Sequence, residues 1–168
     1  FGLNTLGGAL SLTTKSGFTS PGLDAAVRYG SWERRQAELA VGGHTEHFAG
    51  FLAYNRFRED GWRQNSPSDI EQIFGRFDVR TEIMNMTLTA MGADNRLIGN
   101  GTVPVSDLAE DRTQIFTSPD RTETSLGQVN LTHTFFVTPG ITVSALGYYR
   151  RVDQANQDGA VWDDWERS

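Results

Sequence analysis

Hydrophobic and polar residues alternate with a period of two along most of the chain. Clusters of Gly, Pro, Asn, Asp and Ser interrupt this alternation, and helical periodicity is nearly absent. Alternating segments between turn-forming clusters are typical of β-strands, so the pattern predicts an all-β chain. The seven candidate strands are 23–32, 34–42, 48–58, 70–80, 83–93, 124–137 and 141–152.

The last two candidate strands show the clearest alternation, because 124–149 contains no Asp, Glu, Lys or Arg although polar residues are spread through it. One face of the predicted hairpin comprises Gly127, Val129, Leu131, His133, Phe135, Ile141, Val143, Ala145, Gly147 and Tyr149. The other face comprises Gln128, Asn130, Thr132, Thr134, Thr142, Ser144 and Tyr148. Both arms have the roughly 9 to 11 residues that a tilted membrane strand needs. The hairpin therefore has the pattern of a transmembrane β-barrel, with lipid outside and water inside.

The lengths of the predicted connections support the same interpretation. Short connections at 43–47, 81–82 and 138–140 alternate with longer, charged segments at 59–69 and 94–123, and only the first hairpin, around Trp32 and Glu33, lacks the long connection expected there. Membrane barrels place short turns at the periplasmic side and longer loops at the outer side, whereas a soluble sandwich has no reason to segregate loops by length. Aromatic residues near the strand ends fit interfacial girdles, and they fit equally well the general enrichment of aromatic residues in strands.

Composition and charge exclude several other classes of protein. The chain has 168 residues, a length typical of one domain, and its 15 basic and 21 acidic residues give a net charge of −6. This acidic balance argues against nucleic-acid binding. The absence of Cys excludes disulfide scaffolds, thiolate metal sites and Cys nucleophiles. No apolar run approaches the roughly 18 residues of a transmembrane helix, which does not exclude a membrane β-barrel, because barrel strands alternate.

The opening segment 1–17, with the sequence FGLNTLGGALSLTTKSG, resembles the end of the plug domain of TonB-dependent outer-membrane receptors. In that family a Gly-rich stretch leads into a short apolar strand and a Thr-Lys pair, shortly before the first barrel strand. The matching residues of this chain are Asn4, Gly7, Gly8, Thr14 and Lys15. Segment 23–32 is similar to that first strand, and 58–63 resembles the Asp-Gly-aromatic element at which an early strand enters an outer loop.

This resemblance implies a fold and a function. The implied fold is an all-β antiparallel meander that forms part of a 22-stranded transmembrane β-barrel. Residues 1–20 would be the C-terminal end of a plug domain, and residues 21–168 the N-terminal part of the barrel. Receptors of this family are not enzymes and need no cofactor; they take up a scarce ligand across the bacterial outer membrane. We expect a ferric siderophore as that ligand.

The resemblance also implies partners and further segments. Energy for uptake comes from the inner-membrane TonB complex, which pulls on a short box that would lie upstream of Phe1. At roughly 19 residues per strand, 22 strands need on the order of 400 residues, so we expect this chain to be a piece of a longer protein. Its sheet should then have two unpaired edges. Outer-membrane lipid is an expected partner, and nucleic acid is not.

Candidate ligand contacts are Arg28, Trp62 and Arg63. Arg28 is expected on the inward face of the first strand, and the other two residues in an outer loop. Of the 15 basic residues, 14 are Arg. The planar guanidinium pairs carboxylate, catecholate and hydroxamate oxygens, which suits anionic iron chelates, although a bias in composition also explains the excess of Arg.

We interpret two clusters of His or acidic residues as parts of a turn and a loop rather than as metal or catalytic sites. Zinc-protease motifs place their ligands at helical spacing, whereas 44–47 (His-Thr-Glu-His) is flanked by Gly and predicts a turn. Asp163, Asp164 and Glu166 are expected in a solvated outer loop. No Ser, His and Asp arrangement suggests a catalytic triad, so the sequence predicts neither a metal site nor catalytic residues.

The main alternative is a soluble or surface β-sandwich binding module, such as an adhesin or a carbohydrate-binding domain. A small porin-like barrel without a plug is a third possibility. The facing of the last hairpin separates the first two classes: in a barrel Leu131 and Val143 point into lipid, whereas in a sandwich a second sheet buries them. A barrel also predicts a meander of strands, and a sandwich predicts Greek-key crossings.

Overall fold

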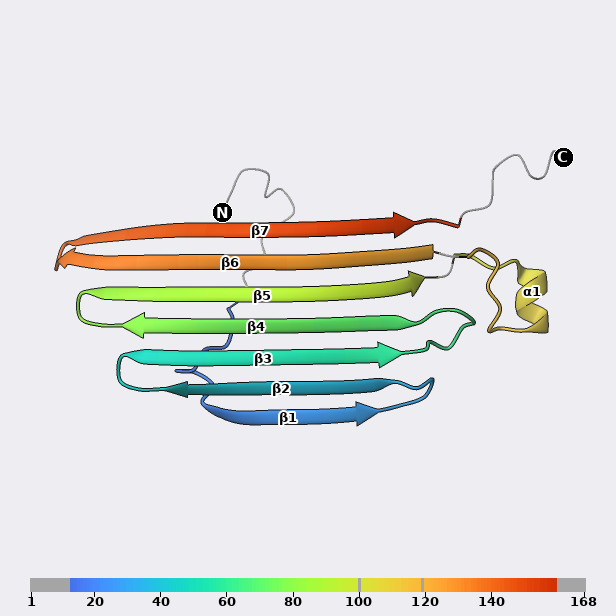
Figure 1. Cartoon of the computed structure of the whole chain (residues 1–168), viewed down its shortest axis with the longest axis horizontal. Helices are drawn as coiled ribbons and strands as arrows, with labels where there is room; N and C mark the ends of the chain where they lie inside the picture. Colours follow the sequence, from blue (N-terminus) through green and yellow to red (C-terminus); the bar gives the residue numbers. More distant parts are fainter. Residues whose placement is uncertain (1–12, 100, 119, 160–168) are drawn as a thin grey trace.

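The computed structural model of the chain describes residues 13–99, 101–118 and 120–159. Seven antiparallel strands form one sheet, and each strand pairs with its neighbours along the chain (Figure 1). The strands are β1 (Gly22–Tyr29), β2 (Arg35–His44), β3 (Phe48–Glu59), β4 (Ser68–Arg80), β5 (Met84–Gly99), β6 (Asp120–Thr138) and β7 (Ile141–Gln157). The predicted all-β meander is confirmed. The sheet is open, with β1 and β7 at its edges.

The last three strands are longer than predicted, and the prediction that 94–123 is a connection is wrong at both ends. β5 continues to Gly99 and β6 begins at Asp120. Cross-strand pairing of charged side chains explains the difference, because Arg96 Nε lies 2.7 Å from Glu123 Oε1. Charged residues that suggest a loop in the sequence thus extend the ladder of paired strands.

A short helix, α1 (Val105–Glu110), lies in the segment between β5 and β6 and was not predicted. Pro104 precedes its first residue and Asp107 lies in its first turn, where an acidic side chain interacts favourably with the helix dipole. Among the described residues, no helix has the length and apolar character needed to cross a membrane.

The connections differ in length at the two ends of the sheet, as predicted. Three short turns, at 45–47, 81–83 and 139–140, lie at one end, which is the left end in Figure 1. The longer segments 60–67 and 101–118 lie at the opposite end, together with the connection 30–34. We call these the short-turn end and the long-loop end.

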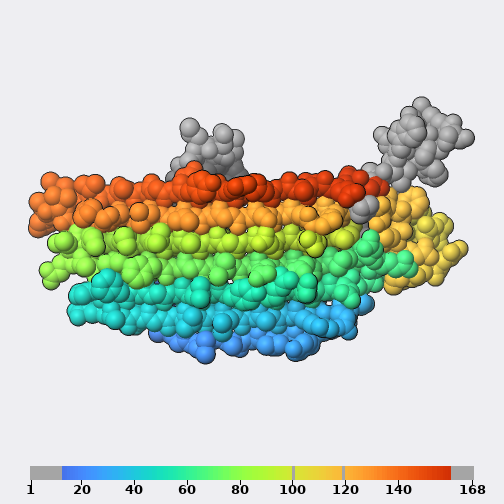
Figure 2. All heavy atoms as spheres, viewed as in Figure 1, coloured from blue at the N-terminus to red at the C-terminus, as the bar shows by residue number. Residues whose placement is uncertain are grey.

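One face of the sheet carries a continuous zone of residues without charge, which we call the apolar band. From β1 to β7 the band comprises Leu23, Ala25, Val27, Tyr29, Ala37, Leu39, Val41, Gly43, Phe48, Gly50, Leu52, Tyr54, Ile73, Gly75, Phe77, Val79, Met84, Met86, Leu88, Ala90, Gly92, Gly127, Val129, Leu131, His133, Phe135, Ile141, Val143, Ala145, Gly147 and Tyr149. Figure 2 looks onto this face, and Figure 1 shows in the same view that the segment 13–21 passes behind the strands.

Most large side chains of the apolar band are exposed, whereas Val79 is buried. Leu131 is 42% exposed and Val143 is 53% exposed. A sandwich needs a second sheet over such a face, but the described residues form a single sheet whose strands follow the chain order without a crossing. The described residues therefore show neither the second sheet nor the Greek-key crossings that the sandwich alternative predicts.

The opposite face, which we call the polar face, carries the segment 13–21. Most buried residues of the described chain gather where this segment meets β3 and β4, and they include Ser16, Ala49, Phe51 and Asp78, whereas buried Val79 lies on the face of the apolar band. Because a buried Ser and a buried Asp need hydrogen-bond partners, this junction is held by polar contacts as well as by packing.

Candidate functional site

A tight turn in the segment 13–21 brings the chain close to the sheet. The Ser20 and Thr19 backbone N–H groups donate to the Ser16 carbonyl oxygen at 2.9 and 3.2 Å. The Ser16 backbone N–H donates to Thr19 Oγ1 at 3.1 Å. Ser and Thr hydroxyls commonly supply such local bonds in turns. The turn places the buried Gly17 directly against the sheet backbone.

Arg76 fixes this segment through a network that we call the Arg76 anchor. Its guanidinium donates to both carboxylate oxygens of Asp78, from Nε and from Nη2, at 2.8 Å each. Its Nη1 donates to Thr14 Oγ1 at 2.9 Å and to the Thr14 carbonyl oxygen at 3.1 Å. Thr87 Oγ1 completes the network by donating to Asp78 Oδ1 at 2.7 Å. Such bidentate, charge-assisted bonds are the strongest class of hydrogen bond in proteins.

An aromatic contact adds a second attachment. The Phe18 ring lies 5.4 Å from the His44 ring, and the Arg80 guanidinium lies 4.2 Å from the Phe18 centroid. His47 Nδ1 lies 3.1 Å from the Arg80 carbonyl oxygen, whereas His44 Nδ1 lies 3.1 Å from the carbonyl oxygen of Thr45. The turn predicted at 44–47 lies at 45–47 between β2 and β3, because His44 is the last residue of β2. The side chains of His44 and His47 have separate partners.

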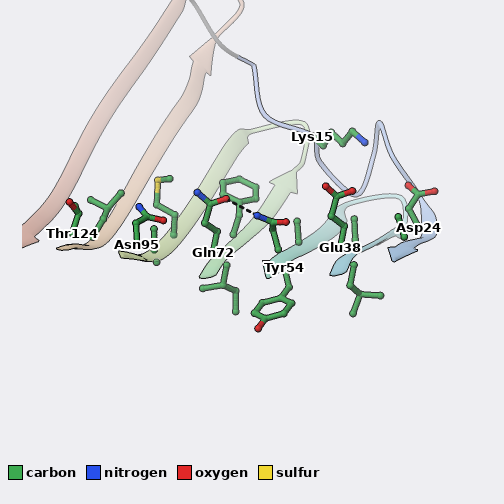
Figure 3. Close-up of a pocket in the computed structure, with 18 of the residues that line it drawn as sticks. Lys15, Asp24, Glu38, Tyr54, Gln72, Asn95 and Thr124 are labelled. Carbon is green, nitrogen blue, oxygen red and sulfur yellow. Dashed lines mark hydrogen bonds between the residues drawn. The ribbon is translucent and has the colours of Figure 1, made fainter. Parts of the chain in front are cut away.

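A cavity of about 800 Å³ lies on the polar face beside this junction. Figure 3 shows that the labelled side chains of Glu38, Gln72, Asn95 and Thr124 point to the side of the sheet on which Lys15 lies, while Tyr54 points to the other side. The polar residues that line the cavity are Lys15, Asp24, Glu38, Asn55, Gln72, Asn95, Thr124 and Arg150. Apolar side chains, among them Phe74 and Met91, line the rest of it.

Amide side chains form a hydrogen-bonded row across the cavity wall. Gln36 Nε2 donates to Asn55 Oδ1, and Asn55 Nδ2 donates to Gln72 Oε1, at 3.2 Å each (Figure 3 shows the second bond). Gln36 also donates to Glu38 Oε1 at 2.7 Å, and Glu38 forms an ion pair of 2.7 Å with Arg28. The amide row adds neutral donors and acceptors to a cavity that also carries the charged side chains of Lys15, Asp24, Glu38 and Arg150.

A second, smaller cavity of about 450 Å³ lies at the long-loop end, next to Trp62 and Arg63. The Arg63 guanidinium lies 4.9 Å from the Trp62 ring, within the range of a cation–π interaction. Arg63 Nη1 donates to the Gly101 carbonyl oxygen at 3.4 Å, while its Nε is buried without a hydrogen-bond partner among the described residues. A buried donor without a partner is uncommon in folded proteins, so this Nε marks an unsatisfied polar group beside the cavity.

Hydrogen bonds join the two longer segments of the long-loop end. The Gln64 backbone N–H donates to the Thr113 carbonyl oxygen at 2.9 Å, and Asn65 Nδ2 donates to Ser118 Oγ at 3.0 Å. Asp111 accepts bonds from the backbone N–H and the hydroxyl of Thr113. These two bonds hold the pKa of Asp111 below its usual value, because they favour the ionised carboxylate. The loops therefore form one connected surface.

The residues predicted from the sequence fall into three places. Asn4, Gly7 and Gly8 of the plug-like segment lie outside the described residues, and so do Asp163, Asp164 and Glu166. Thr14 and Lys15 lie on the polar face, at the anchor and the larger cavity. Arg28 lies on the same face and pairs with Glu38. Trp62 and Arg63 lie together in the segment 60–67.

Sequence reasoning missed the Arg76 anchor. Arg76 and Thr14 are separated by 62 positions in the chain, so no local pattern joins them. One signal was present in the sequence: Arg76 and Asp78 are spaced two apart in a strand, which places both on one face. A charged pair at that spacing, on the face opposite the apolar residues Phe77 and Val79, indicates a structural ion pair.

Replacing Gly17 with Ala is expected to displace the segment 13–21 from the sheet. A Cβ atom at this position would lie 2.2 Å from the Gly43 carbonyl oxygen and 2.4 Å from that of Gly50. Overpacking of this kind costs about 1–3 kcal/mol. Because Lys15 is the only Lys of the chain, cleavage after it by a Lys-specific protease measures the displacement.

Gly50→Ala is the matched control, because nothing lies within 4 Å of a Cβ atom there. We expect this variant to be cleaved after Lys15 at the unmodified rate. Equal cleavage of the Gly17 and Gly50 variants would contradict the close approach of Gly17 to the sheet.

Comparison of the sequence with protein-family models and with curated proteins, and of the structure with solved structures, found no match.

Proposed function

We propose that this chain is part of a TonB-dependent outer-membrane transporter. In this proposal the sheet is part of a 22-stranded barrel, and residues 1–20 are the end of its plug domain. The apolar band is the observation that carries the proposal. A charge-free, exposed face that crosses every strand of a single sheet suits contact with hydrocarbon better than contact with water.

The height of the apolar band fits a bilayer. On β6 the band extends from Gly127 to Phe135, which at about 3.4 Å per residue is roughly 30 Å along the strand. A tilt of about 35–45° reduces this height to roughly 22–25 Å, close to the 25 Å band of transmembrane barrels.

Ion pairs border the apolar band at the long-loop end. On the same face of the sheet, Arg56 pairs with Asp69 and Glu71, Arg58 pairs with Asp69, Arg96 pairs with Glu123, and Arg151 pairs with Asp153. Tyr54 lies just below this border and its hydroxyl donates to Glu71 at 3.0 Å. A change from apolar to charged residues along each strand, with Tyr near the border, is typical of a membrane interface.

The polar face supports the second half of the proposal. The segment 13–21 lies on this face, where the Arg76 anchor holds it, and the cavity beside it has hydrogen-bonding walls. In the proposed plugged barrel, the segment 13–21 is the end of the plug, and the cavity beside it receives the rest of the plug domain. TonB would then act on a part of the protein upstream of Phe1.

A ferric siderophore is the ligand we propose, with Trp62 and Arg63 as contacts at the outer end. An Arg beside an aromatic ring suits an anionic chelate with planar oxygen donors, because the guanidinium pairs such oxygens in a fork and aromatic faces stack on them. Arg28 stays a further candidate on the polar face, although its ion pair with Glu38 occupies it in this structure.

Transport tests the proposal directly. The intact protein is expressed in a bacterial strain that lacks its own siderophore receptors, and cells are given ⁵⁵Fe-labelled catecholate and hydroxamate chelates separately. We expect the protein in the outer-membrane fraction and uptake of one chelate that stops when TonB is deleted. A soluble protein, or uptake that continues without TonB, would contradict the proposal.

The Arg63→Ala variant is expected to weaken uptake at limiting chelate about tenfold or more. Loss of a charge-assisted hydrogen bond costs about 1.5–3 kcal/mol, and each 1.4 kcal/mol is about a factor of ten in affinity. Arg112→Ala is the control, since Arg112 is exposed in the neighbouring loop. Equal concentration dependence of uptake in the two variants would remove Arg63 from the ligand site.

A further inference from the structure

The single His residue of the apolar band has a ring nitrogen without a partner. His133 Nε2 is shielded from solvent, and no group of the described residues forms a hydrogen bond with it. Folded proteins satisfy the large majority of their buried polar atoms. A neutral imidazole nitrogen is also the commonest metal ligand in proteins. The side chains around His133 therefore determine what this nitrogen can bind.

Two of the three Met residues of the chain flank His133 on the same face of the sheet. Met86 lies directly opposite His133 in the register of β5 and β6, and Met84 lies opposite Phe135. Directly opposite residues have Cβ atoms about 4.5–5.5 Å apart, and diagonal neighbours are about 7–8 Å apart. Because a Met side chain is unbranched and has three rotatable bonds, the thioethers of Met84 and Met86 are both within reach of the His133 ring.

An aromatic contact turns the His133 ring toward the row of Met84. Residues two apart in a strand are separated by about 6.8 Å along the chain, yet the ring centroids of His133 and Phe135 lie only 4.0 Å apart. The two rings therefore incline toward each other, and Phe135 is the register partner of Met84. On β7 the partner of His133 is Ala145, whose side chain is one methyl group. The long side chains next to His133 are therefore Phe135 and the two Met residues.

These residues lie in the least exposed part of the apolar band. Val79, which pairs with Met86 on the other side of β5, is 5% exposed. Met84, Met86 and His133 are half-buried, whereas Leu131, the next residue of the band on β6, is 42% exposed. Side chains that packing already restrains lose less conformational freedom when they bind a ligand. The group is therefore partly preorganised.

We propose that His133, Met84 and Met86 together bind one Cu(I) ion. Thioether sulfur is a soft ligand that favours Cu(I), and imidazole also suits copper. All three ligands are neutral, and the chain has no Cys to compete for the ion. Beside an apolar surface a single positive charge is less costly to hold than a double charge, which disfavours Zn²⁺ and Cu²⁺ at this position.

The proposed copper site is separate from the ligand contacts proposed above. Met84 is the first residue of β5 and lies at the short-turn end, on the face opposite the segment 13–21. Trp62 and Arg63 lie at the long-loop end. The Cu(I) ion is therefore not the transported ligand, and the site goes beyond the proposed function. Loss of siderophore uptake leaves the copper site standing, and loss of copper binding leaves the proposed uptake standing.

Competition with bicinchoninate, a coloured Cu(I) chelator, tests the site in the intact protein under ascorbate. The Met86→Leu and His133→Phe variants each remove one ligand and keep an apolar side chain, and a Leu-for-Met exchange conserves volume. Replacing residues that only support metal ligands already costs about 10–100-fold in metal affinity. We therefore expect each variant to bind the ion about tenfold more weakly, or not at all.

Met91→Leu is the matched control, because Met91 is the third Met of the chain and lies on the polar face, opposite Gln128. We expect this variant to bind Cu(I) like the unmodified protein. Equal binding by the unmodified protein and all three variants would overturn the proposal. A loss in Met91→Leu as large as that in Met86→Leu would overturn it as well.

X-ray absorption tests the same site without any substitution. The unmodified intact protein is loaded with one equivalent of Cu(I), and the scattering at the copper edge reports the atoms bonded to the metal. We expect two sulfur atoms and one nitrogen atom. A set of ligands without sulfur would overturn the proposal, even if the Met86 and His133 variants fail to fold.

Discussion

The Leu131→Arg variant of the intact protein is expected to fail in membrane assembly. Leu131 lies in the middle of the apolar band on β6 and is 42% exposed. On the lipid face near the bilayer midplane an Arg costs about 2–4 kcal/mol. Folding into phosphatidylcholine vesicles, followed by the shift in gel mobility between unheated and heated samples, measures this loss.

Thr132→Arg is the matched control. Thr132 is the next residue of β6, is exposed on the polar face, and pairs with Leu146 in the register. An Arg there enters the wet interior of the proposed barrel, so we expect assembly close to that of the unmodified protein. The opposite order of tolerance, with Arg accepted at Leu131 and rejected at Thr132, would show that the apolar band faces a protein core.

The Arg76→Ala variant is expected to lose about 3–5 kcal/mol of stability, because it leaves a buried carboxylate without its charged partner. Asp78 is 2% exposed and Arg76 supplies two of the bonds to its oxygens. The variant also loses both bonds to Thr14. We therefore expect unfolding at lower urea concentration and faster cleavage after Lys15.

Two further variants separate this effect from a general loss of charge. Arg151→Ala removes an ion pair whose side chains are 70% and 63% exposed, and such a pair is worth about 1 kcal/mol or less. The double variant with Ala at both Arg76 and Asp78 removes the stranded carboxylate, so it should recover part of the lost stability. If Arg76→Ala is as stable as Arg151→Ala, the Arg76 anchor does not stabilise the fold.

The positions of the strands were predictable because alternation has a direct physical cause. Successive side chains of a strand point to opposite faces, so a sheet with one apolar face reveals its strands in the sequence. The parts of β5 and β6 at the long-loop end were not predictable in this way. There Asp94, Arg96 and Glu123 are charged on the same face as the apolar band, and a single sequence does not show that they pair across strands.

The candidate site was predictable where neighbours in the chain act together and not where distant segments meet. Trp62 and Arg63 are adjacent, so their joint position in a loop followed from the sequence. The contacts of Gly17 with Gly43 and Gly50 depend on a fold that brings the start of the chain onto β2 and β3. The bond from Asn65 to Ser118 likewise spans 53 positions, and no local pattern encodes it.

The pairing of each strand only with its neighbours in the chain has a consequence for how the sheet can be built. Every contact between strands joins strands that are consecutive in the chain. Adding a strand to the sheet therefore closes only one connecting loop. The entropic cost of closing that loop depends weakly on its length, since doubling a flexible loop adds only about 0.6 kcal/mol. The sheet can therefore grow as a zipper from a single hairpin, one strand at a time. At each stage its free edge presents unpaired N–H and C=O groups that template the next strand, which would suit the stepwise membrane entry that the proposed function requires.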